Sequence, residues 1–419
     1  MSSLNVSEER KITCWDKPLG DIRVLELSMW EAGPTCGTLL AFLGAEVIKV
    51  EPPWGEIGRV VFFGEKRKKE GYKYCHYFAN LNLNKKHITL NIKTRKGKKL
   101  LQMLIRKSDI FLHNLTLQTI EKLGLTYEKV ARINPKIIYA SITGYGEKGP
   151  YKYYPCYDGI AQAMGGIVYL TGHPETPPAR CGASIGDSVA AISAVAGILA
   201  ALHQREATGR SVKVEISMVD TMIGLLRAIS TQYFELNEIP TRRGCAVRGV
   251  VPHNIYKCKD GWIMVTCFDP NQRLKFIDMV CQEMKVNPKK YMPKGGNILD
   301  VTERYIKKVD GLISRWARRK SKKKIFHKLT REGLPCGLVY NLKELMEDPH
   351  IARRKMFLNT KDDLGKKHVI IGNHIKLSTC KLKIQPPPTN PSYHNVEVYT
   401  KVLGLSKEEL EKLKKENII

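Results

Sequence analysis

Residues 22–53, with the sequence IRVLELSMWEAGPTCGTLLAFLGAEVIKVEPP, decide the fold class. The stretch opens with a short apolar run at residues 22–27 and closes with a second one at residues 47–50, and each has the length of a buried strand. Residues 33–43 between them form a helical run, with a proline near the first turn, where its missing N–H costs nothing. A strand, a helix and a strand in this order predict two parallel strands joined by a right-handed crossover.

The alternation of strand and helix continues beyond this unit. The expected strands are residues 87–92, 109–113, 136–142 and 211–216, and the expected helices are residues 94–107, 127–133, 157–169, 187–207 and 218–236. Repeated units with apolar strands predict a doubly wound α/β sheet, which binds ligands at the carboxyl ends of its strands. The motif G-x-G-x-x-G is absent from the sequence, so the usual dinucleotide site is not expected.

The pattern changes after Pro240 to that of a smaller α+β segment. Residues 254–267 are expected to form a hairpin with its turn at residues 259–261. Further helices are expected from about residues 272, 301 and 321, then strands and turns from residue 335, and a charged terminal helix at residues 406–417.

The composition is typical of a globular protein. The chain has 419 residues, of which 43% are apolar, and we expect two lobes, each large enough to bury a core. Residues 1–20 are polar and lack the apolar region of a secretory signal. The longest apolar run, residues 189–202, is interrupted by Ser193 and is shorter than the ~20 residues of a membrane span, so it predicts a buried helix and no membrane partner.

The cysteines indicate the compartment. All eleven are scattered singly, and neither a Cys-x-x-Cys pair nor the His/Cys spacing of a zinc site is present. In a chain of this length the pattern favours free thiols in a reducing cytoplasm, and we expect no metal.

The formal net charge of +28 permits three interpretations. A basic protein can bind nucleic acid by releasing counterions from phosphate, it can bind a small anion such as a nucleotide cofactor, or its surface can be rich in lysine throughout. The basic residues are spread along the chain, and the densest cluster, residues 315–328, has helical spacing with Ile325 and Phe326 turned inward. This distribution favours a lysine-rich surface, and no nucleic-acid partner is expected.

Three places carry candidate chemistry before any family is considered. Asp187 lies between a polar glycine-rich loop and an apolar helix. It is either a plain N-cap or a nucleophile that the helix N-terminus keeps ionised. Asp158 opens a second helix, where a cap is the simpler interpretation. Residues 84–93 place Lys and Asn beside a strand, where they are either solvated or bind phosphate.

Together these segments resemble the class III CoA-transferase family, which includes formyl-CoA transferase, the carnitine-pathway CoA-transferase and the α-methylacyl-CoA racemases. The resemblance extends from about residue 19 to residue 390. The blocks that carry it are LGDIRVLE at 19–26, AGP at 32–34, LGAEVIKVE at 43–51, NKK at 84–86, INP at 133–135, ITGYG at 142–146, GD at 186–187, LAAL at 199–202, TG at 208–209, KDG at 259–261 and GLPCG at 333–337.

The resemblance implies an enzyme of acyl-CoA metabolism with Asp187 as its catalytic residue. In the family the matching aspartate attacks the acyl-CoA thioester, forms a mixed anhydride and releases the CoA thiolate. The thiolate then returns to give an aspartyl-CoA thioester, from which the acceptor acid takes the CoA. One hard exchange becomes several easier ones. Coenzyme A is the carried group, and neither a metal nor a further cofactor is implied.

The resemblance also implies a set of CoA-binding residues. They are Trp30, Glu31, Ala32, Leu90, Asn91, Ile92, Lys93, Asn114, Leu115, Thr116, Lys122, Tyr154, Pro155, Cys156 and Tyr157. Three departures stand out: Glu31 replaces the Gln of formyl-CoA transferase, Lys122 replaces an Arg, and Pro52 replaces a phosphate-binding Arg. We therefore expect the phosphates to be held by Arg59 or by nearby lysines.

Four further residues are candidates for substrate contact, namely Asp158, Gly244, Arg248 and Gly249. The two glycines are the nearest match to the loop that shields the aspartyl intermediate in the family. Arg248 and its neighbour Arg243 are hypothesised to meet the second carboxylate of a dicarboxylate such as succinate. The alternative is a solvated loop.

The family fold implies a large Rossmann-like domain from residues 1–230 and 340–419, where the chain returns and ends in a helix. It also implies a small α+β domain inserted at residues 231–339, and an interlocked homodimer.

Two rival functions stay open. A 2-methylacyl-CoA racemase would have histidine where Tyr157 stands before Asp158, and a basic nucleic-acid-binding protein would have lost catalysis.

Overall fold

The computed structural model describes residues 16–419 except 63–68, 70–72, 293–301 and 381. Residues 1–15 of the polar N-terminal segment therefore lie outside the described residues. The chain divides into two compact units. The first comprises the chain up to Val168, Arg180–Glu238 and His350–Ile419, and the second comprises Tyr169–Ala179 and Ile239–Pro349.

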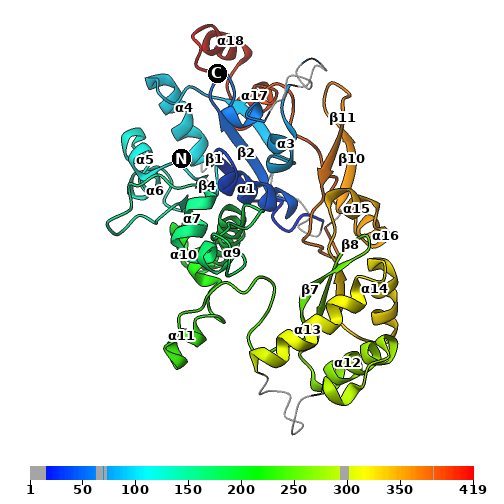
Figure 1. Ribbon diagram of the computed structural model, residues 1–419. Helices are drawn as coiled ribbons and strands as arrows, with labels where there is room; N and C mark the ends of the chain where they lie inside the picture. The colour runs from blue at the N-terminus through cyan, green and yellow to red at the C-terminus, as the bar shows by residue number, and fades with distance from the viewer. Residues whose placement is uncertain (1–15, 63–68, 70–72, 293–301, 381) are drawn as a thin grey trace. The chain divides into compact units, whose positions relative to one another are not determined.

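The first unit is built around a parallel sheet of six strands in the order β3-β2-β1-β4-β5-β6 (Figure 1). The strands are β1 (Arg23–Leu27), β2 (Glu46–Glu51), β3 (Lys86–Thr89), β4 (Ile110–His113), β5 (Ile138–Thr143) and β6 (Val212–Ser217). The strand order reverses between β1 and β4, and open α/β sheets bind ligands beside the carboxyl ends of the strands at such a reversal. The predicted α/β fold with a parallel sheet is confirmed.

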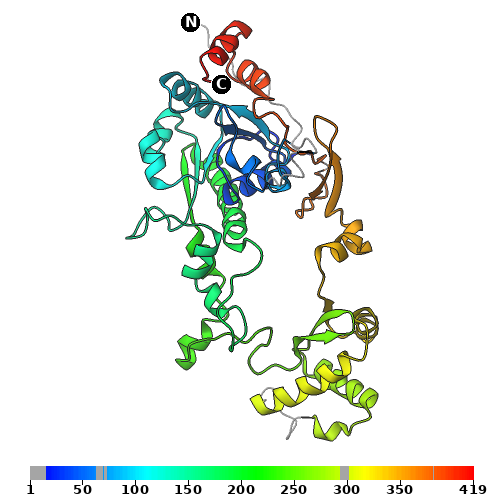
Figure 2. The same ribbon diagram turned by 45° about the horizontal axis from the view of Figure 1, so that its top comes forward.

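Helices cover both faces of this sheet (Figure 2). One core joins α1 and α9 to strand residues such as Val24 and Ile138, and the other joins α4, α6, α17 and α18 to Leu25 and Phe111. Successive side chains of a strand point to opposite faces, so Val24 and Leu25 enter different cores. The helices named here are α1 (Ala32–Phe42), α4 (Arg95–Arg106), α6 (Tyr127–Ile133), α9 (Ile185–Thr208), α17 (Asn395–Lys401) and α18 (Lys407–Lys415).

Two of the predicted helices are each a pair of shorter ones. The expected helix at 157–169 is α7 (Asp158–Met164) followed by α8 (Ile167–Leu170), because Gly166 between them has a φ of 85°. The expected helix at 218–236 is α10 (Met218–Gly224) followed by α11 (Thr231–Leu236). A terminal glycine of low helix propensity ends α10.

The predicted strand at 87–92 is shorter than expected. β3 ends at Thr89, which pairs with Glu51, the last residue of β2. Pro52 and Pro53 follow Glu51 and cannot continue a ladder. The backbone N–H of Leu90 still donates to the carbonyl of Glu51 at 2.8 Å, and residues 91–93 then leave the sheet at its carboxyl edge, where they line a pocket.

The second unit has an antiparallel sheet in the order β7-β8-β9. The predicted hairpin is present as β7 (His253–Cys258) and β8 (Gly261–Thr266). Its core gathers around Trp316 and Phe276. The helix expected from about Val301 begins at Glu303, and Val301 itself lies outside the described residues. The other elements of this unit are β9 (Cys336–Leu338), α12 (Pro270–Met284), η2 (Pro288–Lys290), α13 (Glu303–Ala317), α14 (Lys322–Arg331) and α15 (Leu342–Glu347).

The sequence pattern missed several short elements, most of them in the first unit. They are η1 (Ile57–Arg59), α3 (His76–Leu81), α5 (Leu117–Leu123), α15, α16 (Pro349–Arg353) and α17. Each has at most seven residues, too few to show a hydrophobic period. The strands and turns expected from residue 335 include the hairpin of β10 (Phe357–Lys361) and β11 (Lys367–Ile371).

α9 contains the longest apolar run of the chain. By length and hydropathy it is the one helix among the described residues that meets the criteria for a membrane span. It packs against α1, α10 and β6, and residues such as Ala190 and Ile198 are fully buried in the core of the first unit. The helix is therefore part of the domain core on one side.

Candidate functional site

Asp187 lies in the first turn of α9. Ser184 holds the N-cap position and Asp187 is the third helical residue, so the interpretation of Asp187 as a plain N-cap is wrong. Its side chain is half-buried. The positive end of the helix dipole favours a carboxylate at this position.

Asp158, the first residue of α7, caps α9 from outside. Its Oδ1 atom accepts a hydrogen bond of 2.9 Å from the backbone N–H of Gly186, and its Oδ2 atom accepts one of 2.9 Å from Nε2 of Gln162. Ser184 makes no side-chain cap, so Asp158 satisfies an N–H that the helix itself leaves unpaired. Position 186 suits glycine because a Cβ atom there would lie 3.1 Å from Oδ1 of Asp158.

Glu31 brings a third carboxyl group to the site. It occupies the N-cap position of α1, and its side chain accepts hydrogen bonds from Ser184 and Ser188 on α9. Glu31, Asp158 and Asp187 thus come from the beginnings of three helices that meet beside one another. The sequence predicted all three as site residues without indicating that they meet.

The three carboxyl groups compete for ionisation. Burial first, and then the charges of Glu31 and Asp158, raise the pKa of Asp187 to about 7. Burial also raises the pKa of Glu31, and Asp158 adds to that shift. The thiol of Cys156 has its pKa raised to about 11 by burial and by Asp187 and Asp158, so it stays neutral at physiological pH. Burial and like charge outweigh the helix dipole at Asp187.

A pocket of about 380 Å³ lies at the carboxyl edge of the sheet. Its lining comes from the segments that follow β1, β2 and β3 and from the loop and helix after β4. It includes five of the predicted CoA-binding residues, Leu90, Asn91, Ile92, Lys93 and Leu115. The rest of the lining is Leu27, Ser28, Met29, Val50, Glu51, Pro52, Trp54, Gly55, Glu56, Ile57, Thr119 and Leu123. The surface is mostly apolar, with Lys93 as its one cation.

Asn114 joins the two sides of the strand-order reversal. Its Oδ1 accepts a hydrogen bond of 2.9 Å from the backbone N–H of Met29, and its Nδ2 donates one of 2.7 Å to the carbonyl of the same residue. Trp30, which follows Met29, has a φ of 65°, a left-handed conformation that is costly for a bulky side chain. The amide of Asn114 therefore holds the loop that leads to Glu31.

Arg59 is not available to hold phosphates, contrary to expectation. Its Nε and Nη2 atoms each donate a hydrogen bond of 2.7 Å to the carboxylate of Glu51, and Nη1 donates to the carbonyl of Pro388 at 3.1 Å. The guanidinium also lies 4.3 Å from the ring centre of Phe78. Lys93 and Lys122, in contrast, are exposed near the carboxyl edge.

The remaining candidates of the first unit lie close to the same edge. Ala32 is buried at the start of α1, and Thr116 is the N-cap of α5, with its side chain accepting from the N–H of Thr119. The loop at residues 154–157 runs into α7, and Tyr154 and Tyr157 are largely exposed. None of these residues lines the 380 Å³ pocket.

Gly244, Arg248 and Gly249 belong to the second unit. Gly244 has a φ of 62°, and a Cβ atom there would lie 2.5 Å from the ring of His173. Gly249 has a φ of 72°. Arg243 is engaged, because its Nη1 atom lies 2.8 Å from Oε1 of Glu303. Arg243 is 35% exposed and Glu303 61%, so this is a surface ion pair, and the choice between a solvated loop and a substrate contact stays a prediction.

A buried ion network supports the carboxyl edge, and the sequence pattern gave no sign of it. Lys85 lies 2.9 Å from Oε2 of Glu26, and Lys49 lies 3.2 Å from Oε1 of Glu26 and 2.8 Å from Glu56. Burial would raise the pKa of Glu26, but the two lysines together hold it below its usual range. Lys49 also donates to the carbonyl of Ser28 at 2.9 Å, so the network fixes the loop before Trp30.

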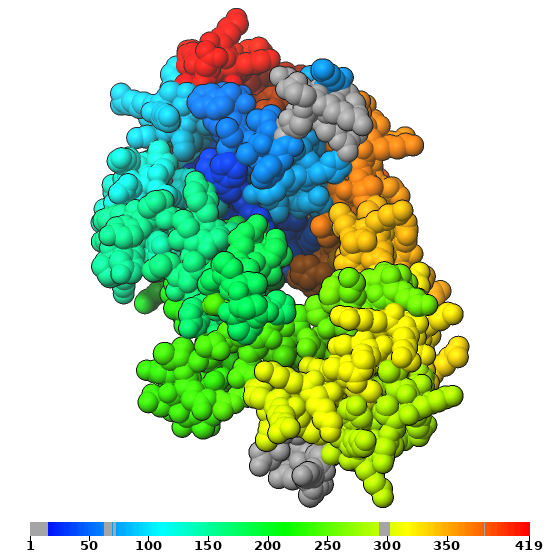
Figure 3. Space-filling view, in the orientation of Figure 1, coloured from blue at the N-terminus to red at the C-terminus, as the bar shows by residue number. Residues whose placement is uncertain are grey.

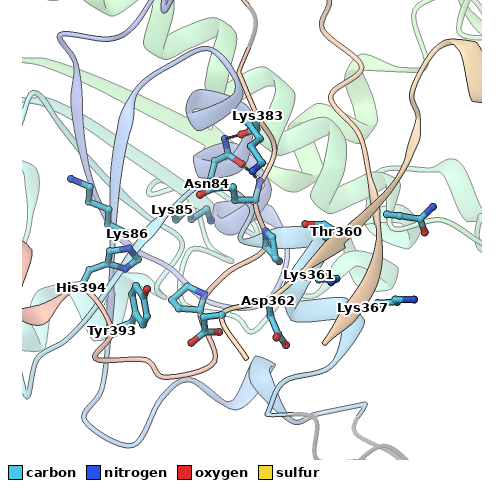
Figure 4. A pocket seen from close by; sticks show the side chains of 15 residues that line it. Asn84, Lys85, Lys86, Thr360, Lys361, Asp362, Lys367, Lys383, Tyr393 and His394 are labelled. Atoms are coloured by element: carbon cyan, nitrogen blue, oxygen red, sulfur yellow. Dashed lines mark hydrogen bonds between the residues drawn. The ribbon is translucent and has the colours of Figure 1, made fainter. Parts of the chain in front are cut away.

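A larger cavity, of about 740 Å³, lies at the opposite end of β3 (Figure 4). Figure 4 shows Lys86, Tyr393 and His394 on one side of it and Thr360, Lys361 and Lys367 on the other. Asn84, Lys85 and Lys86, the start of the segment predicted either to be solvated or to bind phosphate, line it, whereas none of the predicted CoA-binding residues does. Lysines are expected in any cavity of a chain with net charge +28, so its charge alone does not indicate a ligand.

The described residues contain no group of three or more His, Cys, Asp or Glu that could hold a metal ion. The ten cysteines in this part of the chain are free thiols.

Comparison with known proteins gives one consistent family. A profile described as CoA-transferase family III matches residues 19–395. The formyl-CoA:oxalate CoA-transferase of Streptomyces avermitilis is 35% identical over 425 residues, covering 96% of this chain and 100% of that protein. The succinyl-CoA–D-citramalate CoA-transferase of Chloroflexus aurantiacus is 33% identical over 415 residues, covering 96% and 98% of the two chains.

Solved structures agree with the fold. A CaiB/BaiF family protein from Brucella suis has a TM-score of 0.79 and 27% identity, covering 92% of this chain and 100% of its own. A protein from Mycobacterium tuberculosis has a TM-score of 0.74 and 26% identity, covering 91% and 99% of the two chains.

Proposed function

The chain belongs to CoA-transferase family III and is a CoA-transferase, and from this premise we propose that Asp187 is the nucleophile that carries the CoA between two acids. The observation that carries the proposal is the place of Asp187. Its carboxyl group lies in the first turn of α9, half-buried, with its pKa raised to about 7. A carboxylate with that pKa is more basic than an ordinary aspartate and still ionised in a large fraction at neutral pH.

The reaction is a sequence of acyl exchanges. A carboxylate oxygen of Asp187 attacks the thioester carbonyl of the donor, the C–S bond breaks, and the CoA thiolate leaves a mixed anhydride on Asp187. The thiolate then attacks the aspartyl carbonyl, which releases the donor acid and leaves an aspartyl-CoA thioester. The acceptor carboxylate attacks that thioester, the C–S bond breaks, and the thiolate leaves a second mixed anhydride between Asp187 and the acceptor. The thiolate then attacks the acceptor's carbonyl in this anhydride, which gives the acceptor's CoA thioester and frees the carboxylate of Asp187. Anhydrides and thioesters are comparably activated, so no step is strongly uphill.

The pocket at the carboxyl edge is proposed to hold the adenosine end of CoA. Its apolar lining suits a purine ring, and it lies beside the strand-order reversal, where such sheets bind nucleotides. The exposed lysines Lys93 and Lys122 are proposed to replace the arginine that Pro52 displaces. A Lys93→Gln, Lys122→Gln double variant is expected to weaken CoA binding by about tenfold by calorimetry. Unchanged binding at low and at physiological salt would remove these lysines from the proposal.

The acceptor is proposed to be a dicarboxylate. The names of the relatives include oxalate and citramalate, which carry two carboxylates, and succinyl-CoA, which is the CoA thioester of a dicarboxylate. The sequence makes Arg243 and Arg248 candidates to bind the second carboxylate. The ion pair of Arg243 with Glu303 argues against that residue.

A CoA-exchange assay tests the reaction. The protein is incubated with several acyl-CoAs and labelled mono- and dicarboxylic acids, beside Asp187→Ala and Asp187→Asn, and new thioesters are followed by mass spectrometry. Transfer by the wild type and none by the variants is expected. If no acid receives CoA and a chiral 2-methylacyl-CoA loses its stereochemistry, the racemase interpretation replaces this one. Tight, salt-dependent binding to DNA without exchange would favour the nucleic-acid interpretation.

We also propose an interlocked homodimer in which the inserted domain, predicted at residues 231–339, corresponds to the second unit, whose main part is Ile239–Pro349. Support comes from apolar side chains that the first unit leaves exposed along α9, α10 and α11, a segment coloured green in Figure 3. Ile192 is 50% exposed, Ile223 53% and Phe234 77%, and these large apolar residues lie on three successive helices of the chain. Light scattering after size exclusion is expected to give twice the chain mass of 47.5 kDa.

A further inference from the structure

Arg180, which the sequence analysis did not single out, is a cation close to the three carboxyl groups of Glu31, Asp158 and Asp187. Its Nη1 atom lies 3.6 Å from Oδ2 of Asp158 and donates a hydrogen bond of 3.0 Å to the carbonyl of Cys181. Its stem runs along the first turn of α7, with Cδ at 3.8 Å from the position of a Cβ on Gly159. The side chain is nevertheless 56% exposed, so most of the guanidinium faces solvent.

Asp158 accepts no hydrogen bond from the guanidinium of Arg180. A separation of 3.6 Å is too long for a hydrogen bond. Both oxygens of Asp158 already accept hydrogen bonds, one from Gly186 and one from Gln162. The carboxylate therefore holds Arg180 nearby by its charge and leaves the N–H groups of the guanidinium available for another partner.

The charge balance of the site requires such a cation when the acceptor is a dicarboxylate. Glu31, Asp158 and Asp187 supply up to three negative charges. Within the described residues, Arg180 is the one cation found within 4.0 Å of any of these carboxylates. An acceptor must bring its reacting carboxylate to the aspartyl group, and a second carboxylate would add repulsion at each carboxyl group unless a cation meets it.

We propose that Arg180 binds the second carboxylate of the acceptor acid and thereby selects dicarboxylates. The guanidinium offers two parallel N–H donors, which match a carboxylate in a planar, bidentate pair. Asp158 links the two parts of the site, because the carboxylate that attracts Arg180 also accepts the N–H of the residue before Asp187. The inference rests on the proposed CoA-transfer by Asp187.

The test compares succinate with butyrate, which has the same chain length and one carboxylate. Steady-state transfer is measured with the full-length wild type, Arg180→Gln, Arg180→Lys and the control Arg210→Gln, an exposed arginine after the end of α9. For Arg180→Gln we expect KM for succinate to rise about 10- to 100-fold, the loss of a charged hydrogen-bonded pair. KM for butyrate should change less than about threefold, and kcat at saturation should hold for both acids.

For Arg180→Lys we expect a KM for succinate between those of the wild type and Arg180→Gln, because lysine keeps the positive charge but lacks the two parallel N–H donors of the guanidinium. Arg210→Gln should match the wild type. The donor half-reaction, followed as the CoA adduct on Asp187 by intact-protein mass spectrometry without acceptor, should be unchanged in every arginine variant. A variant that loses this adduct is damaged at the nucleophile, and Arg180→Lys then decides the assignment through its succinate-to-butyrate ratio.

Two failures are distinguishable. Suppose that the wild type transfers CoA, but Arg180→Gln either raises KM for succinate and for butyrate by the same factor or changes neither KM. Arg180 then does not bind the second carboxylate, and the inference is overturned. If the wild type forms no adduct and transfers CoA to no acid, the proposed function itself has failed.

Discussion

The Oδ1 atom of Asp158 accepts a 2.9 Å hydrogen bond from the backbone N–H of Gly186, the residue directly before Asp187. A side chain of α7 thus caps α9 and determines where the carboxyl group of Asp187 lies. The same carboxylate raises the pKa of Asp187 through its charge. The support of the helix and the electrostatics of the proposed nucleophile therefore depend on one residue.

The Gly186→Ala substitution tests this contact. The added Cβ would lie 3.1 Å from Oδ1 of Asp158 and 3.3 Å from Cβ of Ala161, so α7 and α9 must shift apart. We expect a loss of about 1–2 kcal/mol in unfolding free energy and a fall in kcat of at least tenfold. Gly182→Ala is the matched control, because a Cβ there has no neighbour within 4 Å. Equal melting temperatures and rates for the two variants would contradict the account.

The pH dependence of transfer reports the ionisation of Asp187. The carboxylate is the attacking form and its pKa is about 7, so the rate should fall about tenfold per pH unit below that value and level off above it. Glu31→Gln removes a negative charge that raises the pKa of Asp187, so the acidic limb of the pH–rate profile should move to lower pH. Glu206→Gln, at an exposed position on the same helix, should leave it in place. A limb that stays in place in Glu31→Gln would show that the two groups are not coupled.

Gly37→Ala tests the buried network at the carboxyl edge. An added Cβ would lie 1.8 Å from Oε2 of Glu26, a fully buried atom that cannot move into solvent. We expect the unfolding free energy to fall by about 3 kcal/mol or more, because a buried ion pair is also separated. Gly224→Ala, where a Cβ meets nothing within 4 Å, should stay within about 0.5 kcal/mol of the wild type in urea unfolding.

Glu51 is expected to contribute to stability against acid. Burial would raise its pKa, but hydrogen bonds from Arg59 and His87 and the charge of Arg59 together hold it well below the usual range. The contribution is therefore fully present above the unfolded value of about 4.3 and is lost as pH falls below it. Glu51→Gln leaves Arg59 buried without a counter-charge and should cost about 3 kcal/mol at pH 7.

The pH profile of unfolding provides the control for that prediction. Between pH 7 and pH 3 the wild type should lose more stability than Glu51→Gln, since the variant has no carboxylate to protonate at this position. Glu411→Gln, an exposed substitution in α18, should follow the wild type. Parallel profiles for all three proteins would show that Glu51 is not the acid-sensitive group.

The sequence by itself determined the fold class and the alternation of strands and helices along the first part of the chain, whereas the order of the strands within the sheet came from the structure. The strands predicted at residues 47–50 and 109–113 match β2 and β4, the latter from Ile110, because strands covered by helices on both faces are mostly apolar. Local pattern failed where a helix breaks. Gly166 ends a run that reads as one helix, and the residues on either side retain helical composition.

Only the tertiary structure decided how the site residues meet. Asp158 and Gly186 are 28 residues apart, and Glu31 comes from another helix still, so no periodicity joins them. The sequence made Arg59 a candidate for phosphate binding, but Glu51 occupies its guanidinium. Arg180 drew no attention as one arginine among many, yet it lies beside the carboxyl groups of the site. A residue type indicates what a side chain can do, whereas the folded chain decides which partner reaches it first.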